Sequence, residues 1–162
     1  MKRTAFTLTE LLIGMLVMAI LAGAAILNID AMGRQSAQRE AEKVAAFINT
    51  NLRRADITND NLWITIDSSC VDIKQGSFTS KALHDNAASV PNSPVKASNG
   101  CTFQSDNKRL IYPSNQEQSL GTTKFKPIPA GAAVNVSTNS GGKYYITVNG
   151  ADSETLYVLI GE

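Results

Sequence analysis

The longest apolar stretch of this 162-residue chain contains a single acidic residue. The stretch runs from Phe6 to Leu27, with Glu10 near its start, and the basic residues Lys2 and Arg3 precede it. A helix of these 22 residues would be about 33 Å long, which is enough to cross a bilayer core of about 30 Å. The sequence therefore predicts a transmembrane helix over residues 6–27 with a carboxylate inside it.

This carboxylate needs a positively charged partner, because an ionised Glu in hydrocarbon costs roughly 2.5 kcal/mol or more. An α-amino group is such a partner, since it is a cation at neutral pH and attracts a carboxylate more strongly in a low-dielectric setting than in water. If Glu10 of one subunit meets the α-amine of its neighbour, association neutralises both charges. We therefore expect Glu10 to fix the register of assembly between subunits.

The run Phe6-Thr-Leu-Thr-Glu10-Leu-Leu-Ile, after a short basic leader, resembles the prepilin signature of type IV pilins and type II secretion pseudopilins. The resemblance implies that prepilin peptidase cuts between Ala5 and Phe6, that Phe6 becomes the N-methylated terminus, and that Glu10 is the acid used in assembly. Ala5 stands where the family nearly always has Gly. Leu27 stands where many major pilins have a helix-kinking Pro, which favours a minor pilin or a pseudopilin.

Two other interpretations of the N-terminus remain open. In an ordinary secretory signal peptide, Leu11–Leu21 would be the apolar core and Ala22-Gly23-Ala24 the cleavage site. In a plain membrane anchor, the helix would hold the protein in the bilayer without polymerising. Glu10 at the start of the apolar core, and a helical pattern that continues beyond Ala24, argue against the signal peptide.

The helical pattern continues as an amphipathic stripe, because apolar residues recur at spacings of three and four between Ala37 and Ala55. The opposite face carries the charged residues Arg39, Glu40, Glu42, Lys43, Arg53 and Arg54. We expect a leader over residues 1–5 and one helix over 6–55, in the membrane or filament core over 6–27 and amphipathic over 28–55. A globular β head should follow over 56–162.

Short runs rich in β-branched and aromatic residues follow the helix and are separated by turn clusters, which predicts strands. The runs are Leu62–Asp67, Val71–Lys74, Cys101–Gln104, Arg109–Tyr112, Ala133–Thr138, Lys143–Val148 and Thr155–Ile160. Pro127 and Pro129 argue against a central strand over Lys124–Pro129. We expect an α+β fold in which the long helix packs on a C-terminal antiparallel sheet or sandwich that ends in a meander. This pilin-like layout resembles the H-type minor pseudopilins and the fimbrial minor pilins.

The two cysteines, Cys70 and Cys101, lie in the head, which the basic N-terminal residues place outside the cytoplasm. Export favours a disulfide between them. The bond would close a loop of about 30 residues and contribute about 3 to 4 kcal/mol if it is unstrained. The segment from Gln75 to Gly100 is rich in Ser, Asn, Ala and Pro and has little apolar periodicity to hold it. Two unpaired buried thiols are the alternative. A metal site is not expected, because no CxxC pair is present.

Other chemistry is poorly supported by the sequence. The formal charge is +1, and removal of the leader would leave 13 basic and 14 acidic residues, so no excess of positive charge favours nucleic acid. His84-Asp85 has no visible catalytic scaffold, and the cluster Asp56, Asn59, Asp60 and Asn61 lacks the spacing of a calcium loop. Lys108-Arg109 and Lys124-Phe125-Lys126 combine basic and aromatic residues as strand-binding grooves do, but the C-terminal tail is acidic. We expect no enzyme activity, no cofactor and no nucleic-acid partner.

The sequence thus predicts a structural subunit, a minor pilin or pseudopilin, of a type IV pilus or type II secretion pseudopilus. Its expected partners are other pilin or pseudopilin subunits, prepilin peptidase, the inner-membrane assembly platform and inner-membrane lipid. We expect a single-pass protein of the bacterial inner membrane with its head outside the cytoplasm, which then enters a periplasmic or cell-surface filament. The alternative function is a filament-tip subunit that captures DNA or a surface ligand.

Overall fold

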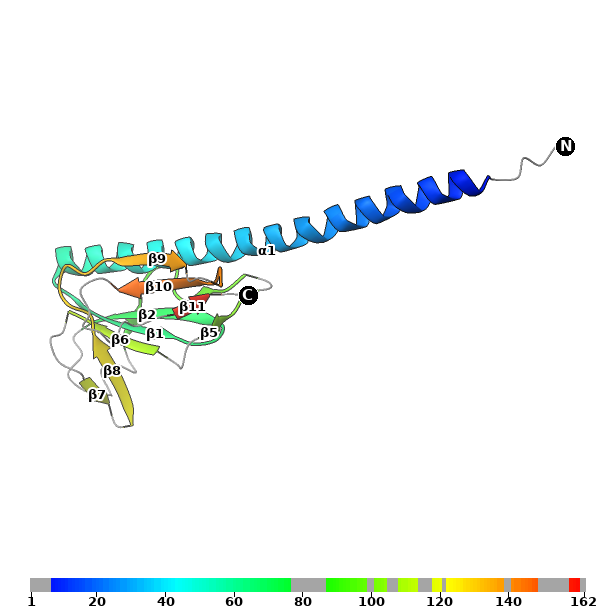
Figure 1. Ribbon diagram of the computed structural model, residues 1–162. Coiled ribbons are helices and arrows are strands. Elements are labelled where there is room, and N and C mark those ends of the chain that lie inside the picture. The colour runs from blue at the N-terminus through cyan, green and yellow to red at the C-terminus, as the bar shows by residue number, and fades with distance from the viewer. Residues whose placement is uncertain are drawn as a thin grey trace. The chain divides into compact units, whose positions relative to one another are not determined.

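The chain divides into two units, Met1–Gln35 and Ser36–Glu162. The computed structural model describes residues 7–76, 87–98, 101–104, 108–113, 118–120, 122–138, 141–148 and 158–160. The helix α1 (Leu8–Thr58) has residues in both units, with residues 8–35 in the first and residues 36–58 in the second (Figure 1).

The end of α1 is formed by the polar residues that follow the amphipathic stripe. α1 ends at Thr58, whereas the sequence placed the end at Ala55. Asn59 follows in the left-handed conformation with φ 54°, which Asn adopts more readily than most residues after a helix. The Asp60 N–H donates to the carbonyl oxygen of Ala55 at 3.2 Å, so the last turn of the helix is closed.

The larger sheet contains seven strands in the order β3-β2-β1-β6-β8-β7, with β4 also paired to β2. Their bounds are β1 (Asn61–Ile66), β2 (Cys70–Gly76), β3 (Ala88–Ser89), β4 (Val95–Lys96), β6 (Lys108–Tyr112), β7 (Gln118–Leu120) and β8 (Thr123–Pro127). All pairs are antiparallel except β6 with β8, where Leu110 lies opposite Lys126 in a parallel register. In the centre of the sheet, Ile64 lies between Ile73 and Leu110.

The smaller sheet contains four antiparallel strands in the order β5-β11-β10-β9. Their bounds are β5 (Phe103–Gln104), β9 (Val134–Thr138), β10 (Tyr144–Val148) and β11 (Val158–Ile160). The last three strands are consecutive neighbours, so a meander ends the fold as the sequence predicted. The turn between β9 and β10 includes Gly142 at φ 74°, a backbone conformation that favours glycine.

The main core lies between residues 36–58 of α1 and the two sheets. The stripe positions Ala41, Val44, Ala45, Ile48, Leu52 and Ala55 are 0–5% exposed and belong to one cluster with residues of both sheets. Strand alternation divides β1 between two faces, because Leu62, Ile64 and Ile66 join this cluster while Trp63 does not. Trp63 contacts Phe125 in a second cluster, with ring centroids 4.3 Å apart and an interplanar angle of 69°. The predicted α+β arrangement is confirmed.

Two expectations about the sheets were wrong. Lys124–Pro129 was expected to be an edge or a loop, but β8 covers Thr123–Pro127 and has neighbours on both sides. Pro127 is tolerated because β7 pairs only with Thr123–Phe125, so among the described residues no strand pairs with Pro127 on that side of β8. The segment from Gln75 to Gly100 was expected to lack its own support, but its described part contributes β3, β4 and the buried Val90.

Candidate functional site

The start of α1 is closed by a reciprocal pair of side chains, Thr7 and Glu10. The Thr7 N–H and the Thr7 hydroxyl both donate to Glu10 Oε2 at 2.9 Å, and the Glu10 N–H donates to Thr7 Oγ1 at 3.3 Å. This is a capping box, in which a Ser or Thr before the helix and a Glu three residues later satisfy each other's backbone donors. The spacing Thr-x-x-Glu shows this role in the sequence, but our sequence analysis treated Glu10 as an assembly residue and gave Thr7 no role.

The capping box positions the Glu10 carboxylate through one of its two oxygen atoms and leaves the other available. Glu10 is exposed, and its Oε1 atom makes no hydrogen bond to the residues that the structure describes. Ala5 and Phe6, where cleavage and methylation are expected, lie outside the described residues. Of the expected N-terminal site, the structure therefore describes the acid and its orientation.

The first turns of α1, on both sides of Glu10, expose a set of large apolar side chains. Their exposed fractions run from 48% at Val17 to 78% at Leu8, and the set is Leu8, Leu11, Leu12, Ile13, Met15, Leu16, Val17, Met18, Ile20 and Leu21. A Cβ atom built on Gly14 or Gly23 would meet nothing within 4 Å. Exposed apolar surface on this scale marks contact with lipid or protein.

The transmembrane helix predicted over residues 6–27 lies partly outside the residues whose side chains the structure describes. Among the helical residues whose side chains the structure describes, no helix is both long and apolar enough to cross a membrane.

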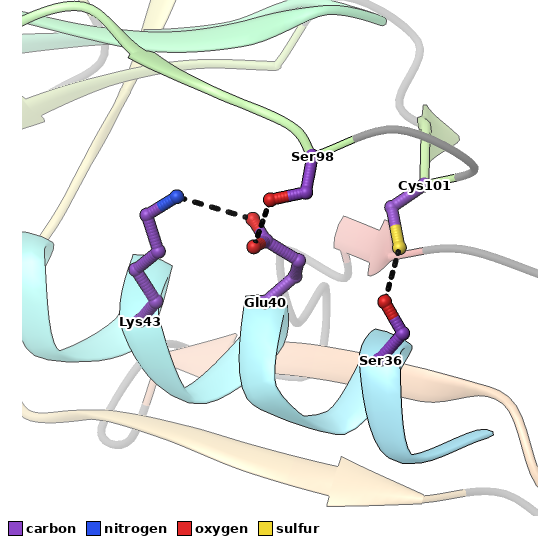
Figure 2. A network of polar contacts seen from close by, with 5 residues as sticks. All are labelled: Ser36, Glu40, Lys43, Ser98 and Cys101. Atoms are coloured by element: carbon purple, nitrogen blue, oxygen red, sulfur yellow. Dashed lines mark hydrogen bonds and ion pairs between the residues drawn. The ribbon is translucent and has the colours of Figure 1, made fainter. Parts of the chain in front are cut away.

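In the second unit, a group of polar side chains joins α1 to the segment before β5 (Figure 2). The Ser98 hydroxyl donates a short hydrogen bond to Glu40, and Lys43 Nζ lies 3.4 Å from Glu40 Oε2. One turn earlier on the helix, Ser36 Oγ lies 3.9 Å from Cys101 Sγ. The sequence placed Glu40 on the solvated face, but it is only 7% exposed, because the segment around Ser98 covers it.

Both cysteines are free thiols in the structure, in place of the expected disulfide. Burial raises the pKa of the Cys70 thiol, and the neighbouring carboxylate of Asp67 acts in the same direction. Cys70 is therefore protonated at neutral pH. The Phe103 N–H in β5 donates to the carbonyl oxygen of Ser68, in the turn between β1 and β2, at 3.2 Å. Each cysteine therefore lies two residues from a residue of this hydrogen bond. The disulfide stays a prediction, and this hydrogen bond is compatible with it.

Two further side chains of α1 hold the small sheet and the loop before it. Asn49 Nδ2 donates to the carbonyl oxygen of Val134 at 2.6 Å, and the Val134 N–H donates to Asn49 Oδ1 at 2.8 Å. The Tyr112 hydroxyl donates to Asp56 and accepts from the Gly131 N–H at 3.2 Å. Burial, followed by the hydrogen bond to Asp56, raises the pKa of Tyr112. Neither contact has a signal in the sequence, because each joins residues far apart in the chain.

The remaining sequence candidates do not gather into a reactive centre among the described residues. His84 and Asp85 lie outside those residues. The Phe125 ring is 1% exposed beneath Trp63, so it is not available to stack on a base, which corrects the basic and aromatic groove considered above. Asp56 and Asp60 are held by Tyr112 and by Gln75 Nε2 at 2.5 Å, as parts of the helix end. In the part of the chain that the structure describes, no three metal-ligating side chains lie together.

Comparison with known proteins identifies one segment of the chain. Residues 1–26 match the family model described as the prokaryotic N-terminal methylation motif. The matched segment includes Ala5, Phe6 and Glu10 and ends before the second unit. No curated protein and no solved structure matches the chain.

Proposed function

We propose that this chain, whose N-terminal methylation motif supports a type IV pilin-like family, is a minor pilin or pseudopilin that assembles through its N-terminal helix. The motif points to a family of structural subunits rather than to an enzyme. It indicates a subunit of a pilus or a pseudopilus. The match over residues 1–26 is the observation that carries the proposal.

The proposed processing joins the matched motif to the geometry at the start of α1. Prepilin peptidase cuts between Ala5 and Phe6, and the new α-amine on Phe6 is N-methylated. The capping box holds Glu10 Oε2 in its own helix, while Oε1 remains for the α-ammonium of a neighbouring subunit. The exposed apolar side chains from Leu8 to Leu21 supply the surface over which neighbouring helices contact each other.

The proposed location follows from the same segment. The motif fits a membrane-anchored pilin precursor. Lys2 and Arg3 hold the leader in the cytoplasm, so the head lies outside it. From the inner membrane, the assembly platform transfers the subunit into a periplasmic or cell-surface filament, where its partners are other pilin or pseudopilin subunits.

The finer assignment to a minor subunit has separate support. Leu27 stands where many major pilins have Pro, and the sequence pattern from Tyr144 to Gly161 resembles the end of the H-type pseudopilins and fimbrial minor pilins. We also propose that Cys70 and Cys101 form a disulfide in the exported protein. Non-reducing peptide mapping should find one linked pair, and two alkylatable thiols in the folded exported protein would contradict it.

The intact mass of the protein extracted from membranes tests the proposal. A mature chain that begins at Phe6 and carries one additional methyl group is the expected result. A chain that begins near Ala25 would establish a secretory signal peptide and would overturn the proposed assembly. A chain that retains Met1 in cells with active prepilin peptidase would favour a plain membrane anchor.

A further inference from the structure

A hollow of about 350 Å³ lies between α1 and the turn that joins β3 to β4. Its lining residues are Lys43, Ala46, Phe47, Thr50, Asn51, Arg54, Pro91 and Asn92, and we call it the α1–turn groove. All of these residues belong to the second unit. None of them has a part in the proposed assembly through the N-terminal helix.

The helix side of the groove presents hydrogen-bond acceptors. The Thr50 hydroxyl donates to the carbonyl oxygen of Ala46 at 2.8 Å, and Asn51 Nδ2 donates to that of Phe47 at 2.9 Å. The Thr50 hydroxyl hydrogen and one of the two N–H groups of the Asn51 amide are thus used inside the helix. Thr50 Oγ1 and Asn51 Oδ1 accept no hydrogen bond from the residues that the structure describes. Asn51 is only 5% exposed, so its acceptor is fixed in direction by its surroundings.

The ends of the groove carry positive charge. Lys43 lies at one end, where its Nζ atom is 3.4 Å from Oε2 of the buried Glu40. Arg54 lies at the other end, is exposed, and has no carboxylate within 4 Å among the described residues. The uncompensated charge is therefore at the Arg54 end, where a bidentate guanidinium can hold a carboxylate.

The opposite wall is a rigid turn. The Ser93 N–H donates to the carbonyl oxygen of Val90 at 3.1 Å, with Pro91 next and Asn92 at φ 66°, which is the pattern of a type II turn. The Val90 N–H donates to the carbonyl oxygen of Ile73 at 3.0 Å, and Ser93 Oγ accepts from the Ile73 N–H at 2.8 Å. Because this wall is held by β2, the groove is largely preformed and costs little to order on binding.

These features define the chemistry of an occupant. A simple anion gains little from the two acceptor oxygens of Thr50 and Asn51 in the middle of the groove, where one amide N–H of Asn51 is the remaining donor. A peptide backbone offers both N–H donors and carbonyl acceptors there. Phe47 and Pro91 supply apolar surface for a peptide side chain, and Arg54 supplies a partner for an acidic one. Positions 47 to 54 of a helix span about 10 Å, which is the length of about three extended residues.

We infer that the α1–turn groove binds a short extended segment of a partner protein that carries an acidic side chain. The backbone N–H groups of the segment donate to Asn51 and Thr50. Its carboxylate pairs with Arg54. The binding needs only the second unit, so it holds whether or not the chain polymerises through its N-terminal helix.

The test uses the full chain in detergent micelles and two capped tripeptides, acetyl-Ala-Glu-Ala-amide and its Gln counterpart. Backbone amide resonances are followed by NMR during titration with each peptide. The Glu peptide should shift the resonances of residues 47–54 and of Asn92. The Gln peptide should bind about tenfold more weakly, because it lacks the charge that Arg54 recognises.

Two arginine variants form a matched pair. Arg54→Gln should weaken binding of the Glu peptide about tenfold, whereas Arg53→Gln, which removes the same charge outside the groove, should change it less than about twofold. The fluorescence of Trp63, the single tryptophan, reports whether each variant keeps its fold. If both variants lost the same affinity for the Glu peptide, the effect would come from net charge alone, and the inference would be overturned. Equal affinities for the two peptides, an absence of binding at millimolar peptide, or shifts confined to residues outside the groove would also overturn it.

Discussion

The apolar residues of α1 meet opposite environments in the two units of the chain. In the second unit, the stripe on the helix is buried, with Ala41 and Val44 0% exposed. In the first unit, the large apolar side chains from Leu8 to Leu21 are 48–78% exposed. The second unit, Ser36–Glu162, which is called the head from here on, therefore completes its core from its own chain. The start of α1 needs an outside partner to cover it.

The polar residues of the helix repeat this contrast. In the head, Glu40, Asn49 and Asp56 bind residues far along the chain and fix the helix to the rest of the fold. At the start, the side chains of Thr7 and Glu10 bond to each other and, among the residues that the structure describes, to no distant part of the chain. Substitutions at the start should therefore alter assembly and leave folding unchanged, and substitutions in the head should do the reverse.

The strongest test of this comparison is Glu10. Glu10→Leu should prevent assembly while the head remains folded, because deletion of one member of a buried charge pair typically costs about 3 to 5 kcal/mol. Glu10→Gln is the matched control for local structure, since Gln also completes a capping box but has no charge. Both variants should be missing from sheared filaments and present in membranes, with processing checked by mass. Normal incorporation of either variant would remove the pairing role of Glu10.

A second test compares two isoleucines of the same helix. Ile48→Ala should destabilise the head by about 2 to 5 kcal/mol, because Ile48 is fully buried and its truncation leaves a cavity. Ile20→Ala removes the same atoms from a side chain that is 64% exposed and should not change head stability. Urea unfolding followed through Trp63 measures both. Similar destabilisation by the two substitutions would show that the units are not independent.

A substitution of Asn49 measures how much a long-range polar contact contributes to the stability of the head. Asn49→Ala leaves the N–H and the carbonyl of Val134 without their side-chain partner, which should cost about 1 to 3 kcal/mol. Asn135→Ala, at the next and exposed position of β9, is the control and should be nearly neutral. The midpoint of urea unfolding distinguishes them, and an Asn49→Ala protein as stable as the control would mean that water replaces the amide without loss.

The smallest expected effect is that of Thr7. Thr7→Ala removes the cap of α1 and should cost about 1 kcal/mol of local helix stability, with no change in head unfolding. Thr7→Ser keeps the capping hydroxyl and should behave as the unmodified protein. Hydrogen exchange of the first turns of α1 in detergent measures the loss. Unchanged exchange in Thr7→Ala would show that the surrounding detergent or lipid stabilises this end by itself.

The sequence predicted the strands whose own residues alternate between apolar and polar. The strands that it missed form because a neighbouring strand pairs with them. Leu62–Asp67 and Lys143–Val148 alternate along their own length, so β1 and β10 could be predicted. β3 and β4 have two residues each and exist because β2 offers them an edge. β8 is parallel to β6, a pairing that no local pattern reveals.

The same division applies to the candidate sites. Glu10 stood out because a charge in an apolar run is expensive, and the cap by Thr7 was readable from its spacing. Glu40 looked like a solvated residue because the sequence of a helix does not show which distant segment will cover it. The α1–turn groove depends on the type II turn at Pro91 and on its attachment to β2, so it could not be found from the chain order.

The amide of Asn49 has a consequence for the proposed assembly. β9 is the last strand of its sheet, and an exposed sheet edge can recruit strands from other copies into amyloid-like stacks. Asn49 occupies the first outward-facing backbone position of that edge with the two hydrogen bonds that an invading strand would otherwise make. In the proposed filament, subunits would then associate through their N-terminal helices and not through this strand edge, even at a high local concentration of heads.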